Sequence, residues 1–447
     1  ALQQDDLAIV AYRQAAAYAP ENAEAGFDYA RVCLRRQDAE QAITELQKVV
    51  GLRPEWAEAH YHLGCALERK SLWSAALEHY ERAATLVPQN ALYHAATGRS
   101  HRRIGNLKPA LAAFQASSRL APESMDYRLQ ISALHREMGQ WEESLAMLKA
   151  SRDLEPQNPA IYAEMGHTLV ARGSLTEALG QYVHAAELAP REPETYRHMG
   201  VILHRLGNLD RALEMLKVAT GLAPEDAETH DNLGQIYQER EQNTLAAMEF
   251  EQAVTHAPET TRYWQHLSQA LCVLQHYESA LEAAQKAVSL APQAAGTHVQ
   301  LAAVYIEQQR PQEALAAYRQ AAELEPENSA HYCGAGRSLY ALGQFPAALA
   351  ALQEAVRRNP GEVEAYRWMG AVYARQEQIS EALGAYQKAL TLQPEAAIHH
   401  HNLGLLYRQI HDSDKALAAL QQAIVLDPHD AEAYYVLGQL HDERSEI

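Results

Sequence analysis

The stretches AAELAPREPETYRHMG (residues 185–200) and ATGLAPEDAETHDNLG (residues 219–234) carry the same pattern 34 residues apart. In each, a proline stands six residues before a tyrosine or histidine, and a glycine closes the segment. The same interval runs through the whole chain, because 13 of its 18 prolines follow at steps of 34, at positions 20, 54, 88, 122, 156, 190, 224, 258, 292, 326, 360, 394 and 428. A period this regular is typical of solenoid proteins, in which each repeat packs on its neighbours.

Each repeat is predicted to hold two helices. With the proline as repeat position 32, twelve full repeats span 23–430, a half repeat spans 1–22 and another spans 431–447. Position 8 is always Gly, Ala or Ser, and position 20 is Ala except at Ser144. Glycine inside a helix costs about 1 kcal/mol relative to alanine, so we expect position 8 to lie against position 20 of the second helix. Bulky residues such as Leu233, Tyr237 and Phe250 then fill the seam, and the proline ends the second helix.

This pattern resembles the tetratricopeptide repeat family, whose repeats carry an aromatic at position 4, Leu-Gly at 7–8, Tyr at 11, Ala at 20, an aromatic at 24, Ala at 27 and Pro at 32. The matching elements include Trp264, Leu403-Gly404, Tyr305, Ala178, Tyr182, Ala185 and Pro190. The resemblance implies an all-α fold: a right-handed superhelical solenoid of antiparallel helix pairs whose first helices line a concave groove. We therefore expect one solenoid over 1–447. Position 4 departs from the family, being Gly26 once and histidine at 60, 94, 230, 298 and 400.

The two ends of the chain read differently. Residues 431–447 are predicted to form a capping helix, whose polar end comprises Asp442, Glu443, Arg444, Ser445 and Glu446. Residues 1–22 read as a second helix without a first-helix partner. Two interpretations stay open: a complete protein, or a piece of a longer one.

Composition excludes several classes of function. The net charge of −19 argues against a nucleic-acid or anionic-membrane surface over the whole molecule. No window approaches 18 apolar residues without charge, so no membrane insertion is expected. The four cysteines form neither a CxxC pair nor a disulfide-like framework, which favours a reducing compartment such as the cytoplasm.

Motifs for catalysis and cofactors are missing from the sequence. It holds no GxxxxGK[ST] phosphate loop, no HExxH and no GxSxG, so we expect no enzyme activity and no cofactor. Gly334 and Gly336 lie within a predicted helix and are interpreted as packing residues. The run from His399 to His401 cannot converge on one metal ion, because successive helical residues point about 100° apart. In register, His400 packs, His401 faces the groove and His399 faces away; no metal site is predicted.

Charge is unevenly distributed along the first helices. Positions 5, 6, 9, 12 and 13 of the twelve repeats hold 13 arginines, seven acids and no lysine, a net charge of +6, so the rest of the chain carries −25. Arginine presents a planar fork of donors suited to carboxylate or phosphate. The predicted partner-binding residues are Tyr61, Arg69, Arg99, Arg102, Arg103, Arg136, Arg197, His198, Arg205, Asn232, Tyr340, Arg367, Trp368, Arg375 and Arg408.

Two interpretations of these residues stay open. The arginines either face a partner or form ion pairs between helices, and Trp368 either anchors a partner or packs between repeats. The first interpretation predicts a non-enzymatic scaffold that binds a protein or peptide in its groove, with acidic or phosphorylated segments over the N-terminal third. The alternative is a recruitment arm of a larger enzyme or signalling ATPase whose catalytic domain lies outside this chain. Nucleic-acid binding in the groove is a third hypothesis, which the overall charge disfavours.

Overall fold

The computed structural model describes residues 2–445, without the side chains of 2–8, 16 and 443–445. Over that range the fold is all-α, with 26 helices and no strand. The helices comprise twelve pairs, one pair in each predicted repeat, with one further helix before them and one after. The predicted all-α solenoid of paired helices is therefore confirmed.

Two compact units divide the chain, Ala1–Leu222 and Ala223–Ile447. One continuous solenoid over 1–447 stays a prediction, and each unit is described by itself. The helices of the first unit are α1 (Leu2–Tyr18), α2 (Ala23–Arg35), α3 (Ala39–Leu52), α4 (Ala57–Arg69), α5 (Trp73–Leu86), α6 (Ala91–Ile104), α7 (Leu107–Leu120), α8 (Met125–Glu137), α9 (Trp141–Leu154), α10 (Pro159–Arg172), α11 (Leu175–Leu188), α12 (Pro193–Arg205) and α13 (Leu209–Leu222).

The second unit has the same organisation. Its helices are α14 (Ala227–Glu239), α15 (Asn243–His256), α16 (Thr261–Val273), α17 (Tyr277–Leu290), α18 (Ala295–Glu307), α19 (Pro311–Leu324), α20 (Ser329–Ala341), α21 (Phe345–Arg358), α22 (Val363–Arg375), α23 (Ile379–Leu392), α24 (Ala397–Gln409), α25 (Ser413–Leu426) and α26 (Ala431–Ser445).

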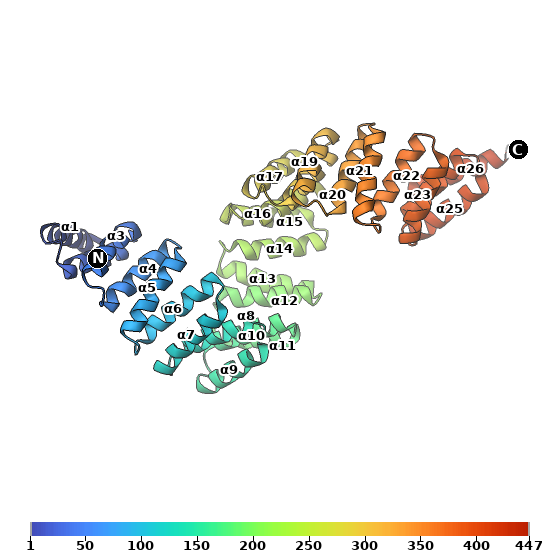
Figure 1. The fold of residues 1–447 in the computed structure, drawn as a ribbon. Coiled ribbons are helices and arrows are strands. Elements are labelled where there is room, and N and C mark those ends of the chain that lie inside the picture. Colours follow the sequence, from blue (N-terminus) through green and yellow to red (C-terminus); the bar gives the residue numbers. More distant parts are fainter. Residues whose placement is uncertain (1, 446–447) are drawn as a thin grey trace. The chain divides into compact units, whose positions relative to one another are not determined.

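Within each unit the helices stack in chain order (Figure 1). Each first helix packs on the second helix of its own repeat, and each second helix packs on the first helix that follows it in the same unit. Several neighbouring first helices also touch, as α8 and α10 do in one unit and α20 and α22 in the other, whereas no comparable contact joins neighbouring second helices in the described range. The first helices therefore line the inner side of each stack, as predicted.

Where position 8 is glycine, as in eight of the twelve full repeats, it lies in tight contact with the second helix of the pair. A methyl group added at Gly234 would lie 2.5 Å from the Phe250 ring, and one added at Gly200 would lie 2.6 Å from Leu216. Both neighbours occupy position 24, while the backbone of position 20 lies slightly farther away, at 3.3 Å from the methyl group added at Gly200. The predicted close approach is confirmed, but its nearest partner is the position-24 side chain.

The turn inside each repeat is closed by a left-handed residue at position 15. This residue has positive φ in all twelve repeats, from 56° at Gln309 to 89° at Gly173. Five of the twelve are glycine, which adopts this conformation without steric cost. The other seven are larger residues, so the geometry of the turn rather than its sequence is constant.

Histidine at position 4 has a structural reason. In ten repeats the position-4 side chain bonds to the carbonyl of the proline six residues earlier, for example His298 Nε2 to Pro292 at 3.0 Å and Trp264 Nε1 to Pro258 at 2.8 Å. The others are His60, His94, Arg128, Tyr162, Tyr196, His230, Tyr366 and His400. Histidine and arginine reach this carbonyl as tyrosine and tryptophan do, so histidine can take the place of the usual aromatic.

The predicted polar cap lies at the limit of the described chain. Helix α26 covers Ala431–Ser445, while Glu446 and the side chains of 443–445 lie outside the described residues. A capping role for this helix is therefore still a prediction.

We predict opposite effects for two glycine-to-alanine substitutions within the second unit. Gly234→Ala should lower the free energy of unfolding by about 1–3 kcal/mol, because its new methyl group overlaps Phe250. Gly384→Ala should raise it by up to about 1 kcal/mol, because Gly384 lies within α23 with no atom inside 4 Å of the added carbon. Urea unfolding followed by circular dichroism measures both; a stabilised Gly234→Ala variant would contradict the packing described here.

Candidate functional site

A pocket of about 530 Å³ opens on the first-helix side of the first unit. It spans three successive repeats, which contribute α4 and the start of α5, then α6, then α8. Its lining residues are Glu68, Trp73, Arg99, Arg102, Arg103, Gln130 and Glu137. Three of the arginines predicted to bind a partner are thus brought together in one hollow.

These three arginines differ in how far their charge is balanced. Arg102 forms a bidentate pair with Glu137, with Nε 3.0 and 3.2 Å from the two carboxylate oxygens. Arg99 lies 3.9 Å from the nearest oxygen of Glu68, beyond hydrogen-bond distance. Arg103 stacks over the Trp73 ring at 5.4 Å. The pocket therefore carries one net positive charge and two guanidinium groups with free donors.

A second set of contacts continues along the inner side from α8 to α12. Arg136 Nε donates to Glu164 at 3.0 Å, the other oxygen of Glu164 lies 3.3 Å from His167 Nδ1, and His167 Nε2 lies 3.2 Å from His198 Nε2. His198 also stacks on Tyr182 with ring centroids 5.3 Å apart. Burial would raise the pKa of Glu164, but hydrogen bonding from His167 and the charge of Arg136 outweigh it, so this pKa is lowered.

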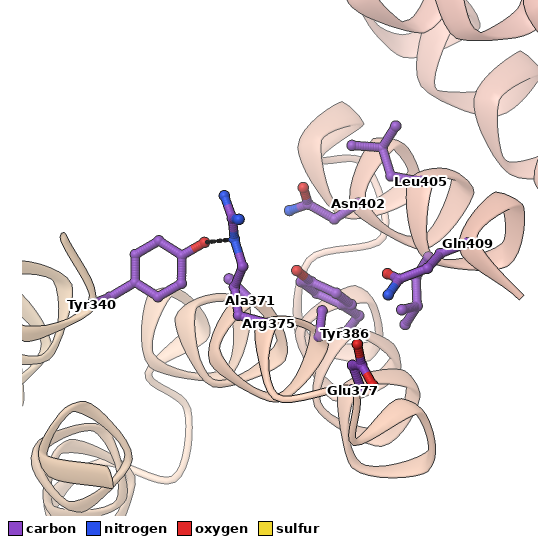
Figure 2. Close-up of a pocket in the computed structure, with 10 residues that line it drawn as sticks. Tyr340, Ala371, Arg375, Glu377, Tyr386, Asn402, Leu405 and Gln409 are labelled. Carbon is purple, nitrogen blue, oxygen red and sulfur yellow. Dashed lines mark hydrogen bonds between the residues drawn. The ribbon is translucent and has the colours of Figure 1, made fainter. Parts of the chain in front are cut away.

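The second unit has a pocket of about 480 Å³ between α20, α22 and α24 (Figure 2). Its lining residues are Tyr340, Ala371, Ala374, Arg375, Glu377, Tyr386, Asn402, Leu405, Leu406 and Gln409. Arg375 Nε donates to the Tyr340 hydroxyl at 3.3 Å, across neighbouring repeats. This pocket is less charged than the first, with one arginine, one glutamate and several apolar side chains.

Trp368 lies beside this pocket and is half-buried. Arg367 lies over its ring at 4.5 Å and Arg337 at 5.7 Å, while the Tyr340 ring is 5.3 Å away. Arg367 is also paired with Glu364 on the same helix, with Nε 3.0 Å from a carboxylate oxygen. Trp368 therefore packs between repeats, while its predicted contact with a partner stays a prediction.

Family models match this pattern of helix pairs. Tetratricopeptide repeat models match residues 4–64, 61–124, 163–227 and 232–295, together more than half of the chain. The chain belongs to the tetratricopeptide repeat family. Residues 273–446 also match the model of the Cilia and flagella-associated protein 70 C-terminal domain, to which this part of the repeat protein is similar. Among curated proteins, none matches the chain.

Three solved structures are similar to this chain. The APC/C hetero-tetramer Cut9–Hcn1 matches at 15% identity and a TM-score of 0.48, covering 98% of this chain and 93% of that one. Yeast Tom70 matches at 16% identity and a TM-score of 0.46, and the match covers 96% of this chain and 97% of that one. YrrB, described as a TPR protein with an unusual peptide-binding site, matches at 23% identity and a TM-score of 0.37. The match covers 41% of this chain and 95% of YrrB. Since these TM-scores lie below 0.5, the family assignment rests on the repeat models and the helix pairs.

Other predicted site residues of this tetratricopeptide repeat protein lie apart from the two pockets. Arg69 donates to the Leu34 carbonyl at the end of α2, and Tyr61 belongs to an aromatic cluster with Tyr80 and Tyr93. Arg205 is exposed on α12. The remaining three, Arg197, Asn232 and Arg408, are half-buried on α12, α14 and α24.

Several pocket residues were not predicted from the sequence. Trp73 and Tyr386 belong to second-helix positions, and Gln130, Leu405 and Gln409 carry no charge. A signal for Tyr386 did exist: alanines at 371 and 374 leave room on the inner side for a tyrosine at position 24. The distribution of charge along the sequence does not reveal the place of Tyr386 in this pocket.

The histidine run at 399–401 differs from its prediction. His399 was expected to face away but is 1% exposed, between repeats, and His401 was expected to face the groove but is buried against Asp430, with Nδ1 2.7 Å from its carboxylate. The reason is that positions 3 and 5 both lie against neighbouring helices here. No group of three or more potential ligands in the described chain could hold a metal ion, and none of its described helices is both long and apolar enough to span a bilayer.

We predict that His198 makes stability depend on pH. Burial lowers the pKa of His198 to about 3, and the neighbouring charges of His167 and Arg197 act in the same direction. The pKa of histidine in an unfolded chain is about 6.5, so between these two values the unfolded chain binds more protons and the free energy of unfolding falls as pH falls.

The test is His198→Phe, which keeps a ring against Tyr182 but does not titrate. Relative to wild type, its free energy of unfolding should depend less steeply on pH between about 6.5 and 3, by up to about 1.4 kcal/mol per pH unit. Urea titrations at several pH values measure the difference. Parallel curves for both proteins would show that His198 is not responsible.

Proposed function

We propose that this tetratricopeptide repeat protein is a non-enzymatic interaction scaffold that binds a protein or peptide segment on the first-helix side, with an acidic or phosphorylated segment over the pocket of the first unit. The observation that carries the proposal is the pocket that joins Arg99, Arg102 and Arg103 across three repeats. Family membership supports the role of interaction scaffold in general.

The electrostatics of the pocket favour an anionic partner. Glu137 balances Arg102, and Glu68 accepts a hydrogen bond from the Tyr80 hydroxyl at 2.6 Å rather than a close one from Arg99. Arg99 and Arg103 therefore keep donors for a ligand. Charge-assisted bonds from arginine to carboxylate or phosphate are roughly twice as strong as neutral ones.

The shape of the pocket favours a segment rather than a small molecule. The lining residues come from repeat positions 6, 9, 12, 13 and 17, so the hollow belongs to a stripe that recurs on each first helix. A chain lying along this stripe meets the next repeat about every 10 Å. Trp73, which lies under Arg103, adds an aromatic surface for the aliphatic part of a partner side chain.

We predict that Arg99→Glu/Arg103→Glu weakens binding of a fluorescein-labelled acidic dodecapeptide by at least about tenfold, because two attractive charges become repulsive. Fluorescence anisotropy measures the affinity for this peptide, for a copy with phosphoserine, and for a copy in which glutamine replaces each glutamate. The glutamine copy should bind weakly to wild type.

The matched control is Arg119→Glu/Arg211→Glu, which changes the net charge equally on exposed positions of the second helices α7 and α13. This control should bind the acidic peptide as wild type does. Equal loss in both double variants would reduce the effect to overall charge, and an unchanged affinity of the Arg99/Arg103 variant would remove this pocket from the proposal.

A further inference from the structure

The pockets of the two units use equivalent repeat positions with different chemistry. Position 13 is Arg103 in one and Arg375 in the other, whereas Arg99 and Arg102 are replaced by Ala371 and Ala374. At position 24, which lies beneath them, Phe114 is replaced by Tyr386. Because the side chains of Ala371 and Ala374 are short, the Tyr386 hydroxyl beneath them gives the second pocket a polar floor that the first pocket lacks.

Tyr386 supplies this floor. Its ring packs on the bare backbone of α22, since a methyl group added at Gly370 would lie 2.6 Å from it, and the residue is only 6% exposed. Figure 2 shows its hydroxyl pointing into the space between Arg375 and Asn402. The hydroxyl has no hydrogen-bond partner among the described residues, although it lines the pocket. Burial raises the pKa of Tyr386 to about 12, so the group stays a donor at neutral pH.

The hydroxyl groups of the position-24 tyrosines in two other repeats have different surroundings. The Tyr80 hydroxyl donates to Glu68 at 2.6 Å and is thereby satisfied. The Tyr182 hydroxyl also lacks a partner, but it is closed off from solvent. Tyr386 thus combines a buried ring, an unused donor and an opening to a pocket.

Arg375 provides the charge. Its Nε is held by the Tyr340 hydroxyl, which raises the pKa of Arg375 and leaves the terminal nitrogens free for a ligand. Glu377 also lines the pocket, yet no ion pair joins it to Arg375 in the described chain. The charges of Arg375 and Glu377 therefore both act on a ligand that enters the pocket.

The remaining walls are amide and apolar. Asn402 and Gln409 present side-chain amides from α24, and Leu405 and Leu406 lie between them on the same helix. An anion bound at Arg375 and Tyr386 would have aliphatic surface beside it. A free inorganic anion would leave this surface uncovered.

We propose that this pocket binds the side-chain carboxylate of an acidic residue in a partner segment, with an aliphatic neighbour of that residue against Leu405. Arg375 and the Tyr386 hydroxyl donate to the carboxylate. One arginine opposed by Glu377 suits a single negative charge better than a phosphate dianion. The inference rests on the proposed function only in placing a partner segment on the first-helix side; the site and its chemistry are separate from Arg99 and Arg103.

The experiment uses the full chain with methyl-labelled leucine, titrated with N-acetyl-glutamyl-leucinamide and, as a neutral control, N-acetyl-glutaminyl-leucinamide. The Leu405 and Leu406 methyl signals should move with the glutamyl probe, and the glutaminyl probe should bind at least about fivefold more weakly. Tyr386→Phe should weaken glutamyl binding by about three- to tenfold, because one donor to a charged acceptor is lost. Arg375→Gln should weaken it by about tenfold or more, and Glu377→Gln should strengthen it by about two- to threefold.

The matched control is Tyr182→Phe, which removes an equally unpartnered hydroxyl that does not open to this pocket. It should leave glutamyl binding unchanged, and thermal melting of each variant shows whether it is folded. Equal binding of the two probes, or wild-type affinity in a folded Tyr386→Phe variant, would overturn the inference. In that case the effect of Arg99→Glu/Arg103→Glu on the acidic dodecapeptide would still decide the proposed function independently.

Discussion

In eight of the twelve full repeats, the bare backbone of a glycine at position 8 lies against the side chain at position 24 and brings the two helices of the pair close together. At Gly234 and Phe250, for example, no room is left for a single methyl group. Because this contact recurs in the same register wherever position 8 is glycine, it fixes how far the first helix of those repeats stands from its second helix. The inner stripe of polar side chains, and the pockets that interrupt it, depend on that spacing.

Along this stripe of polar side chains, most charges are balanced by other side chains of the same protein. Arg102 and Arg136 are paired with acids one repeat away, so the interpretation of ion pairs between helices holds for part of the arginine set. Elsewhere the balance is incomplete, as at Arg103, which rests on Trp73, and at Arg375, which is held by a tyrosine hydroxyl. The binding surfaces that we propose lie where this balance of charge is incomplete.

The fold could be predicted from the sequence because its determinants are local and repeated. Proline at 32 and a small residue at 8 act within one repeat, so their spacing alone places all 24 helices of the twelve full repeats. The site was predictable only in part. Arg99, Arg102 and Arg103 could be grouped by register, but Tyr386 depends on what two alanines on another helix leave open. The burial of His399 likewise depends on packing between helices, which charge and spacing do not encode.

The left-handed corner at position 15 has a consequence for how much stability the chain has in reserve. Seven corners carry a side chain in a conformation that usually costs of order 1 kcal/mol for residues other than glycine. Five glycine corners show that the architecture accepts relief of that strain. Of the seven, Glu377 also lines a pocket. Glycine at any of the other six corners, whether by natural variation or by protein engineering, should therefore raise the stability of the stack without changing the chemistry of that pocket.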